Sequence, residues 1–246
     1  MTETYRKSFH LPATAVDRFD RLKPSYILNL LQEVAGDHSD LLGADKQALT
    51  DRNLFWAVIR HRVSVTRLPK AGEDITVETW PMPTTRTTYP RSSVIYDSQG
   101  QELMRSISLW VLMERDTRAM ILPGKSGILV EGHLEGSELA TPGSLIPKPL
   151  GNAQQRQVRY TDLDWNGHMN NCRYLDWVAD LLPSDFHQQH WVRDFTVCYL
   201  SEAVEGEQIQ LNWELQEDGS LRMDGQRETG EVSTGRGRVF SVQMLF

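Results

Sequence analysis

The chain has 246 residues, of which 39% are hydrophobic and 24% charged, as is typical of a globular protein with a substantial core. Its formal net charge of −7 argues against a nucleic-acid surface, and no stretch approaches the roughly 20 apolar residues of a membrane span. Residues 1–16 lack an apolar signal core, and only two cysteines suit a reducing compartment. We therefore expect a cytoplasmic protein without a cleaved presequence that binds neither nucleic acid nor membrane, with a homodimer left open.

The first half of the chain predicts one helix followed by a meander of strands. After a short strand pattern at residues 5–11, Pro24 suits the first turn of a helix, apolar residues recur at helical spacing as far as Leu42, and Gly43 supplies a stop. Strand patterns rich in Val, Ile, Tyr and Trp then cover residues 55–65, 75–80, 89–96 and 103–113. One helix followed by such a meander makes an α+β unit.

Glycine and proline become dense between residues 123 and 155, where they interrupt regular structure. This composition predicts an N-terminal domain at residues 1–125, a linker at residues 126–155 and a C-terminal domain at residues 156–246. The apolar patch at residues 128–130 is expected to pack locally.

The pattern of the first half begins again after this linker, which indicates an internal duplication. A shift of 144 positions carries Leu31 onto Leu175 and the rest of the apolar helix face with it, and Pro183 is expected to end this second helix. A shift of 134 positions carries Gly72 onto Gly206, together with the strands on either side. Each half therefore predicts a long helix wrapped by a curved antiparallel sheet, which is the hotdog fold.

Residues 161–171 are the part of the chain richest in chemistry. Two carboxylates, three carboxamides and an imidazole stand directly ahead of the second apolar helix pattern. Asp, Asn and Gly favour turns and N-caps, so we expect a loop that leads to a helix start near Asn170. Polar side chains beside the free amides of a helix start can hold an oxyanion, although an elaborate cap on a solvated loop is the simpler interpretation.

The duplication provides an internal control for this loop. Under the two shifts, the first-half counterparts of Asp164, Asn166, His168 and Glu202 are Asp20, Leu22, Pro24 and Leu68. If the loop served only to start a helix, both halves could use the same device, but the first half uses Pro24 and plain residues. The asymmetry therefore favours a functional site in the second half.

Two kinds of metal site match parts of the same region. Residues 162–167 match the opening of an EF-hand calcium loop, but its twelfth position, which requires glutamate, is Arg173. His187 and His190 together with His168 lack a zinc-ligand spacing and are better explained as surface histidines. We therefore predict no metal.

The residues of the loop carry a resemblance to a known family. The pattern Asp164-x-Asn166-x-His168-x-Asn170-Asn171, followed by Tyr199-x-x-Glu202, resembles that of the acyl-acyl-carrier-protein thioesterases, which are tandem hotdog enzymes that release fatty acids. Residues 53–58, 79–80 and 108–111 are similar to signatures of the same family. The resemblance implies a catalytic set formed by Asp164, Asn166, His168 and Glu202, with no cofactor.

Cysteine chemistry is not expected in this set. Many plant members of the family have a cysteine directly after the glutamate, where this chain has Ala203. Cys172 lies four residues beyond His168, but its place in a packed helix favours a small core residue. The plant members also begin with a transit peptide, so the resemblance is to a bacterial form.

The chemistry of thioester hydrolysis suits these groups. A carboxylate, either Glu202 or Asp164 acting through His168, would activate water, with Asn166 orienting it. Amides near Asn170 and Asn171 would polarise the carbonyl. Two alternatives stay open at this point: a hotdog thioesterase that acts on acyl-coenzyme A, and a non-hydrolytic acyl binder or hydratase.

The first half, which lacks the polar loop, is the expected host for the acyl chain. Trp56, Trp80 and Trp110 with their aliphatic neighbours are predicted to line an apolar tunnel, although each could equally fill the core. The predicted partner is acyl carrier protein, which is acidic and would need a local basic patch. The candidates for that patch are Arg86, Arg91, Arg105, Arg156, Arg159 and Arg173.

Overall fold

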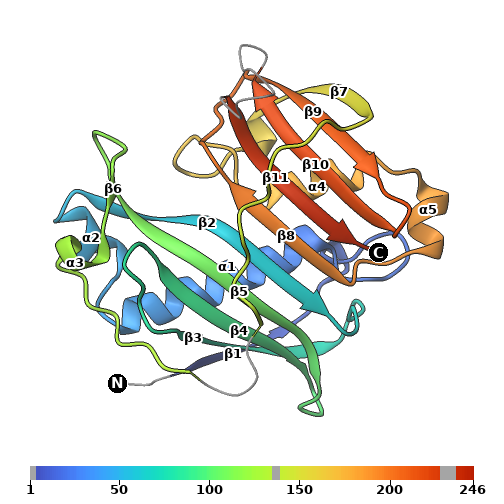
Figure 1. Ribbon diagram of the computed structural model, residues 1–246. Helices are drawn as coiled ribbons and strands as arrows, with labels where there is room; N and C mark the ends of the chain where they lie inside the picture. The colour runs from blue at the N-terminus through green and yellow to red at the C-terminus, as the bar shows by residue number, and fades with distance from the viewer. Residues whose placement is uncertain (1–3, 135–138, 228–236) are drawn as a thin grey trace. The chain divides into compact units, whose positions relative to one another are not determined.

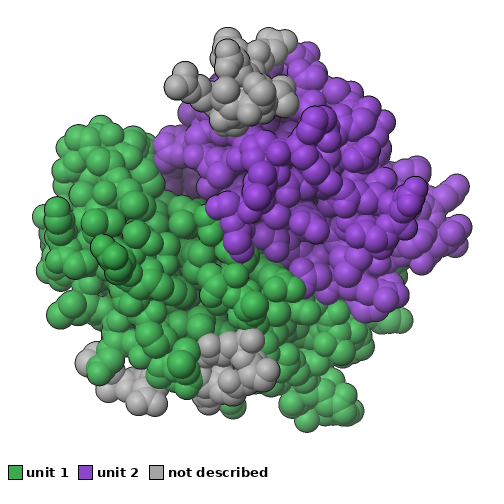
Figure 2. All heavy atoms as spheres, in the orientation of Figure 1, with its two compact units in different colours: residues 1–142 green, residues 143–246 purple. Residues whose placement is uncertain are grey.

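The computed structural model describes residues 4–134, 139–227 and 237–246, and the chain divides into two compact units (Figures 1 and 2). Unit 1 comprises residues 1–142 and unit 2 residues 143–246. Among the described residues, no helix is long and apolar enough to cross a membrane.

Unit 1 is one long helix against an antiparallel sheet with the strand order β1-β3-β4-β5-β2, and β6 pairs with β5 (Figure 1). Its elements are β1 (Tyr5–His10), η1 (Ala13–Ala15), α1 (Pro24–Leu41), α2 (Lys46–Thr50), β2 (Leu54–Val65), β3 (Asp74–Pro81), β4 (Tyr89–Asp97), β5 (Glu102–Glu114), β6 (Met120–Ile121) and α3 (Pro123–Ser126).

The predicted helix and strands of unit 1 are confirmed to within a few residues. α1 has Pro24 in its first turn, and Gly43 beyond its end adopts a positive φ of 74°, a conformation that glycine tolerates. No sequence pattern predicts α2, because five residues are too few for a helical periodicity. Asp45 caps this short helix by accepting a hydrogen bond from the Ala48 amide.

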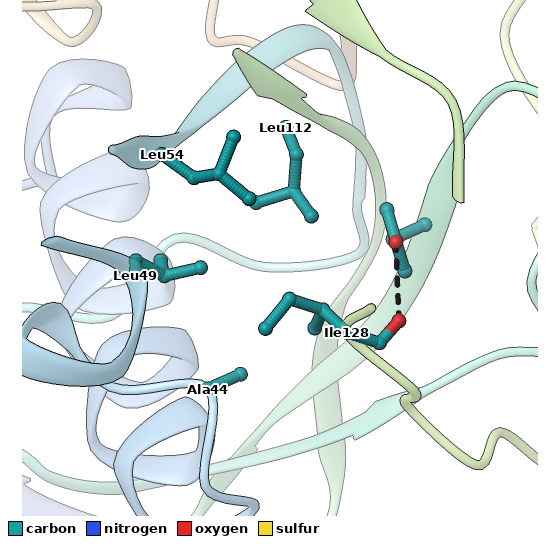
Figure 3. Close-up of a cluster of buried hydrophobic side chains, with 6 residues drawn as sticks. Ala44, Leu49, Leu54, Leu112 and Ile128 are labelled. Carbon is teal, nitrogen blue, oxygen red and sulfur yellow. Dashed lines mark hydrogen bonds between the residues drawn. The ribbon is translucent and has the colours of Figure 1, made fainter. Parts of the chain in front are cut away.

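A cluster of buried apolar side chains joins α2, the strands and the start of the linker (Figure 3). Its buried members are Ala44, Leu49, Leu54, Tyr89, Leu112 and Ile128, with Trp56, Trp110, Ile121 and Val130 packed against them. Ile128 is 6% exposed, and its carbonyl accepts a hydrogen bond from the Tyr89 hydroxyl. The local packing predicted for residues 128–130 is therefore confirmed for Ile128 and Val130, whereas Leu129 is 93% exposed.

Unit 2 has the same layout with the strand order β7-β9-β10-β11-β8. Its elements are β7 (Asn152–Gln157), η2 (Tyr160–Asp162), α4 (Arg173–Ala179), α5 (Ser184–Gln189), β8 (Asp194–Tyr199), β9 (Gln208–Leu215), β10 (Ser220–Arg227) and β11 (Arg238–Leu245).

Strand register confirms that the two units are copies. The pairing of Tyr5 with Thr79 between β1 and β3 recurs as Asn152 with Trp213 between β7 and β9, and every other pair of these strands follows in step. The remaining three strand pairs of the units also match in register, including a β-bulge between β4 and β5 that recurs between β10 and β11. Such agreement requires a shared fold and not only a shared hydrophobic pattern.

The second helix is shorter than predicted. α4 spans only Arg173–Ala179, so it neither starts near Asn170 nor extends to Pro183. At its start, residues 170–173 form a turn instead, in which the Cys172 amide bonds the Asn170 side chain and the Arg173 amide bonds the Asn170 carbonyl. At its end, Pro183 disfavours helical backbone in the residue before it and instead begins α5.

The predicted linker of residues 126–155 also contains regular structure. The compact units divide between Pro142 and Gly143, and β7 begins at Asn152, inside the predicted linker. β7 was missed because its sequence, Asn-Ala-Gln-Gln-Arg-Gln, is polar on both faces.

Candidate active site

The polar loop of unit 2 is closed by the carboxylate of Asp164. This side chain accepts hydrogen bonds from the backbone amides of Asn166 at 2.8 Å and His168 at 3.3 Å. The Asp164 amide in turn donates to the His168 carbonyl, and Gly167 takes a positive φ of 79°. Asp, Asn and Gly are the residues that such a turn requires, which explains why the sequence is dense in them here.

Unit 1 contains the same turn, built around Asp17. The Asp17 carboxylate accepts the amides of Phe19 at 2.8 Å and Arg21 at 3.0 Å, and the Asp17 amide donates to the Arg21 carbonyl. Matching isolated bridges flank the two turns, Val16 with Leu22 and Leu163 with Met169.

The structural counterpart of Asp164 is therefore Asp17, and the mapping of Asp164 onto Asp20 was wrong. The shift of 144 positions was derived from the helices, whereas the loops superpose with a shift of 147. The connection between the loop and the helix pattern is three residues shorter in unit 2, so one shift cannot align both.

The corrected alignment sharpens the difference between the units. The amide of Met169 donates to the Ala203 carbonyl as the amide of Leu22 donates to the Pro69 carbonyl, so Glu202 does correspond to Leu68. Apart from Asp164, the residues of the predicted catalytic set differ between the units: Asn166, His168 and Glu202 in unit 2 correspond to Phe19, Arg21 and Leu68 in unit 1.

His168 and Glu202 lie next to each other at the surface of unit 2. The His168 Nε2 atom is 3.6 Å from the Glu202 Oε2 atom, and the two side chains are 19% and 42% exposed. This separation is too long for a direct hydrogen bond and suits groups that share a water molecule. Asn166 is exposed two residues before His168, so an imidazole, a carboxylate and a carboxamide meet solvent together.

Arg227 is a part of this site that the sequence did not reveal. Its guanidinium donates to the Glu202 carbonyl and to the Ser201 hydroxyl, and it forms an ion pair with Glu207 at 3.0 Å. Arg227 thus fixes the backbone that presents the Glu202 side chain. It lies on a different strand and in no motif with Glu202, so only the fold brings them together.

Three of the backbone amides predicted to polarise a carbonyl, those of Asn170, Cys172 and Arg173, are engaged in bonds within the fold. The Asn170 amide donates to the Asp162 carbonyl, and the Cys172 amide donates to the Asn170 side chain. The Arg173 amide bonds the Asn170 carbonyl, which completes a hydrogen-bonded turn ahead of α4. Asn170 is therefore structural here.

Asn171 is tied to the sheet through its carbonyl. The Tyr199 hydroxyl donates to that carbonyl at 3.1 Å. Burial raises the pKa of Tyr199 well above its ordinary value, so the phenol keeps the proton that this bond requires. Tyr199 is the last residue of β8 and Glu202 follows it by three residues, so the end of this strand positions both the loop and the glutamate.

The three predicted tunnel tryptophans of unit 1 do not share a surface. Trp56 and Trp110 are half-buried and pack against the cluster of Figure 3. Trp80 pairs with Ser92, which places it on the opposite face of the sheet, where it stacks on His133. Trp80 therefore cannot line the same apolar space as the other two.

The predicted basic patch is also reduced by the structure. Arg91 is buried, and three others form ion pairs, Arg105 with Glu102, Arg156 with Asp180 and Arg173 with Asp176. Arg86 and Arg159 are exposed.

Neither cysteine chemistry nor a metal cluster is apparent at this site. Burial raises the pKa of Cys172 to about 12, so its thiol is not ionised near neutral pH. In the described ranges, no group of three His, Cys, Asp or Glu side chains is arranged to hold a metal ion. His187 and His190 bond backbone carbonyls of their own helical region instead.

Known proteins share this architecture over the whole chain. An acyl-ACP thioesterase from Bacteroides thetaiotaomicron superposes with a TM-score of 0.89 at 22% identity, covering 99% of this chain and 98% of that one. A 12:0-ACP thioesterase from Umbellularia californica gives 0.81 at 22% identity, with 100% and 97% covered. A MaoC-like dehydratase from Phytophthora capsici gives 0.60 at 12% identity, with 99% and 94% covered, so the fold alone does not decide the reaction.

Sequence relatives agree with the fold. The chain is 27% identical to an oleoyl-acyl carrier protein thioesterase of Arabidopsis thaliana, over 84% of this chain and 62% of that protein. It is 26% identical to a dodecanoyl-[acyl-carrier-protein] hydrolase of Cinnamomum camphora, over 72% of this chain and 50% of that protein. The chain thus spans about half to three fifths of these plant proteins.

Models of one family match both units. The acyl-ACP thioesterase N-terminal domain matches residues 2–122, and the acyl-ACP thioesterase C-terminal domain matches residues 148–236. The two models together cover most of the chain, and each falls on one of the two halves that the duplication predicts. The chain belongs to the acyl-ACP thioesterase family.

Proposed function

We propose that this chain hydrolyses the thioester of acyl-acyl carrier protein and releases a free fatty acid. The observation that carries the proposal is the pairing of His168 with Glu202, at 3.6 Å, in the unit of the duplicated fold that keeps polar groups at these positions. Membership of the acyl-ACP thioesterase family gives the substrate class.

In the proposed reaction Glu202 is the general base. Its carboxylate takes a proton from a water molecule, whose oxygen adds to the thioester carbonyl. The tetrahedral intermediate then collapses, the carbon–sulfur bond breaks, and the departing thiolate takes up the proton that Glu202 removed from the water. His168 and Asn166 orient the water and the thioester, and no cysteine nucleophile takes part.

The surroundings of Asp164 favour Glu202 over Asp164 as the base. The Asp164 carboxylate already accepts two backbone amides, and Asp17 does the same in the unit that lacks the other polar groups. Asp164 reaches His168 through the backbone amide and not through the imidazole. Its proposed role is to hold the loop that carries His168.

The acyl chain is proposed to bind in unit 1, against the apolar cluster that includes Trp56 and Trp110. The partner is proposed to be acyl carrier protein, for which Arg159 is an exposed cation in the segment that leads into the polar loop. Affinity that fails to fall with rising salt would count against this electrostatic contribution.

One assay separates the proposed function from its alternatives. The same acyl group is offered on acyl carrier protein and on coenzyme A, and the released thiol is trapped with a dye. The proposal expects thiol release with a higher kcat/KM on the carrier protein. A preference for coenzyme A would favour the acyl-coenzyme A thioesterase, and the absence of thiol release from both would favour a binder or hydratase.

A further inference from the structure

The sheet of unit 2 has polar side chains on the face that points away from α4. The Phe240 ring packs on Tyr174 of α4 with ring centroids 4.2 Å apart, and Phe240 pairs with Gly225 of β10. Because side chains alternate between the two faces of a strand, Asp224 and Gln226 lie on the opposite face. Both are buried, so another part of the chain covers this face.

Residues 143–150, which we call the strap, cross this polar face over β11 and β10 (Figure 1). The Arg238 guanidinium donates to the Leu145 carbonyl at 3.2 Å, and the Arg222 guanidinium donates to the Ile146 carbonyl at 3.2 Å. The Ile146 side chain itself is exposed. Two cations of the sheet therefore hold the strap through its backbone.

A pocket of about 180 Å³ lies between the strap and the sheet. Residues 147–150 form one wall, and the side chains of the other wall are Asn212, Asp224, Gln226 and Arg238. An apolar cavity of about 150 Å³ is enough to hold benzene. The pocket is therefore large enough for an organic molecule of about six non-hydrogen atoms.

The charged side chains around this pocket carry a net positive charge. Arg222 and Arg238 share the carboxylate of Asp224, whose Oδ1 atom is 2.9 Å from Arg222 Nη2 and 3.8 Å from Arg238 Nη1. Within the described ranges neither arginine forms an ion pair with another acidic side chain, including Glu214, the neighbour of Arg222 on β9. Lys148 of the strap adds a further, exposed cation.

The two buried guanidinium groups also have unused hydrogen-bond donors. Arg238 bonds the Leu145 carbonyl and the Ser241 hydroxyl through Nη1 alone. The Nε atoms of Arg222 and Arg238 are buried and have no hydrogen-bond partner among the residues that the structure describes. Burial of a charged donor without enough acceptors destabilises the fold. An anion in the pocket would offset the excess positive charge and accept hydrogen bonds from Arg238.

The duplication shows that the fold does not require this arrangement. Strand register matches three residues of the pocket wall with residues of unit 1, namely Asp224 with Val94, Gln226 with Tyr96 and Arg238 with Glu102. Unit 1 thus has neither the arginine nor the buried carboxylate at these positions. The charged pocket is a property of unit 2 alone within the described chain.

We propose that the pocket under the strap binds a small monocarboxylate with a short apolar tail. The carboxylate pairs with Arg238 and accepts a hydrogen bond from the Asn212 carboxamide. The tail lies against the prolines and the leucine of residues 147–150. A single negative charge is favoured over a double one, because the Asp224 carboxylate belongs to the same wall.

The direct test is a titration of the wild-type chain with sodium butyrate at constant ionic strength, followed through backbone amide chemical shifts. The amides of Lys148, Leu150 and Gln226 should shift and reach saturation. Butyramide, which has the same shape and no charge, should bind at least about tenfold more weakly, because it cannot form the charge-assisted bond to Arg238. Inorganic phosphate should also bind more weakly than butyrate, because Asp224 repels its second charge.

Variants of the two cations test the same site. Arg238→Gln should lower the affinity for butyrate by about tenfold or more. Arg238 also holds the strap, so Lys148→Gln, at an exposed position, is the variant expected to fold in any case, and it should lower the affinity by about two- to fivefold. Arg193→Gln is the control, because Arg193 is an exposed arginine of unit 2 outside the pocket, and its affinity should equal that of wild type.

Four results would overturn the inference. They are butyrate shifts that leave Lys148 and Leu150 unchanged, equal binding of butyramide, tighter binding of phosphate, and wild-type affinity in Lys148→Gln together with Arg238→Gln. Shifts confined to the surroundings of His168 would belong to the first of these results and would place butyrate at the proposed active site. Thioester hydrolysis is not measured in any of these experiments, so their outcome is independent of the proposed function.

Discussion

Residues 16–22 of unit 1 and residues 163–169 of unit 2 fold into the same turn and carry different side chains. Asp17 and Asp164 make the same backbone bonds in both turns. The imidazole of His168 stands where unit 1 has the guanidinium of Arg21, itself paired with Asp17. A carboxylate in this turn is therefore a requirement of the fold, whereas the imidazole is not.

The comparison separates the polar residues that the fold requires from those that are available for catalysis. Residues that recur with the same bonds, such as the aspartates and the Gly-Glu turn, satisfy backbone amides in both units. Asn166, His168 and Glu202 occur in unit 2 only, so they are not needed for the bonds that the two units share. The predictions below contrast matched positions of the two units.

The largest effect is expected at the imidazole. His168→Ala should lower kcat for acyl carrier protein thioesters by about 10²–10⁴-fold, the usual range for a lost acid–base or orienting group. The matched substitution Arg21→Ala should leave kcat within about threefold, because Arg21 belongs to the turn without the chemistry. Both are measured by steady-state thiol release, with far-ultraviolet circular dichroism to show that each variant is folded. Equal losses in the two variants would contradict the assignment.

The two aspartates should behave alike in stability and differently in activity. Asp17→Ala and Asp164→Ala should each lower the free energy of unfolding by about 1–3 kcal/mol, because each leaves two backbone amides without their acceptor. Urea denaturation measures this loss. Only Asp164→Ala should also lower kcat, since it releases the loop that carries His168.

The variant Asp164→Asn separates positioning from charge. It keeps an acceptor oxygen for the amides of Asn166 and His168, so activity should fall by less than about tenfold if Asp164 only positions the loop. A fall as large as that of His168→Ala would show that the negative charge of Asp164 takes part in the reaction.

The free energy of unfolding of unit 1 should decrease in acid, because the sheet of this unit buries His61. Burial lowers the pKa of His61 to about 3, whereas an unfolded histidine titrates near its ordinary value of 6.5. Below pH 6.5 the unfolded chain therefore binds a proton that the folded chain does not, and stability is lost as the pH falls toward 3. The slope approaches about 1.4 kcal/mol per pH unit.

His61→Gln should flatten this dependence. The matched position in unit 2 is Phe195, which does not titrate, so the acid-sensitive transition is expected in unit 1 alone. Thermal unfolding followed between pH 4 and pH 7 measures the effect. A wild-type curve that parallels the variant throughout would show that His61 is not the responsible group.

The smallest effect is expected at the cysteine nearest the site. Because burial raises the pKa of Cys172 to about 12, iodoacetamide at neutral pH should leave thioester hydrolysis unchanged within about twofold. Cys172→Ala should likewise retain activity. Rapid inactivation of wild type that Cys172→Ala abolishes would require a role for the thiol.

Much of the fold was accessible from the sequence because it depends on local patterns. Alternating apolar residues, Pro24 at a helix start and glycines at turns are read directly from the chain, and the duplication follows from counting. The polar loop at residues 161–171 stands out in the sequence because a turn closed by an aspartate is rich in Asp, Asn and Gly, and polar residues are also typical of a catalytic site.

The parts that were missed depend on three-dimensional detail. The mapping of Asp164 onto Asp20 failed because the connection after the loop differs in length between the units. The amides of Asn170 and Cys172 are hydrogen-bonded to acceptors that no sequence pattern identifies. Trp80 lies on the far face of its sheet, and Arg227 reaches Glu202 only through strand pairing.

The central claim is that Glu202 activates water for thioester hydrolysis. The most direct measurement is single-turnover thiol release from acyl carrier protein by Glu202→Gln, with Glu205→Gln as control, because Glu205 is an exposed glutamate of the same turn. The rate should fall at least about 100-fold in Glu202→Gln and stay within about twofold of wild type in Glu205→Gln. A Glu202→Gln variant that is folded and hydrolyses at the wild-type rate would contradict the account.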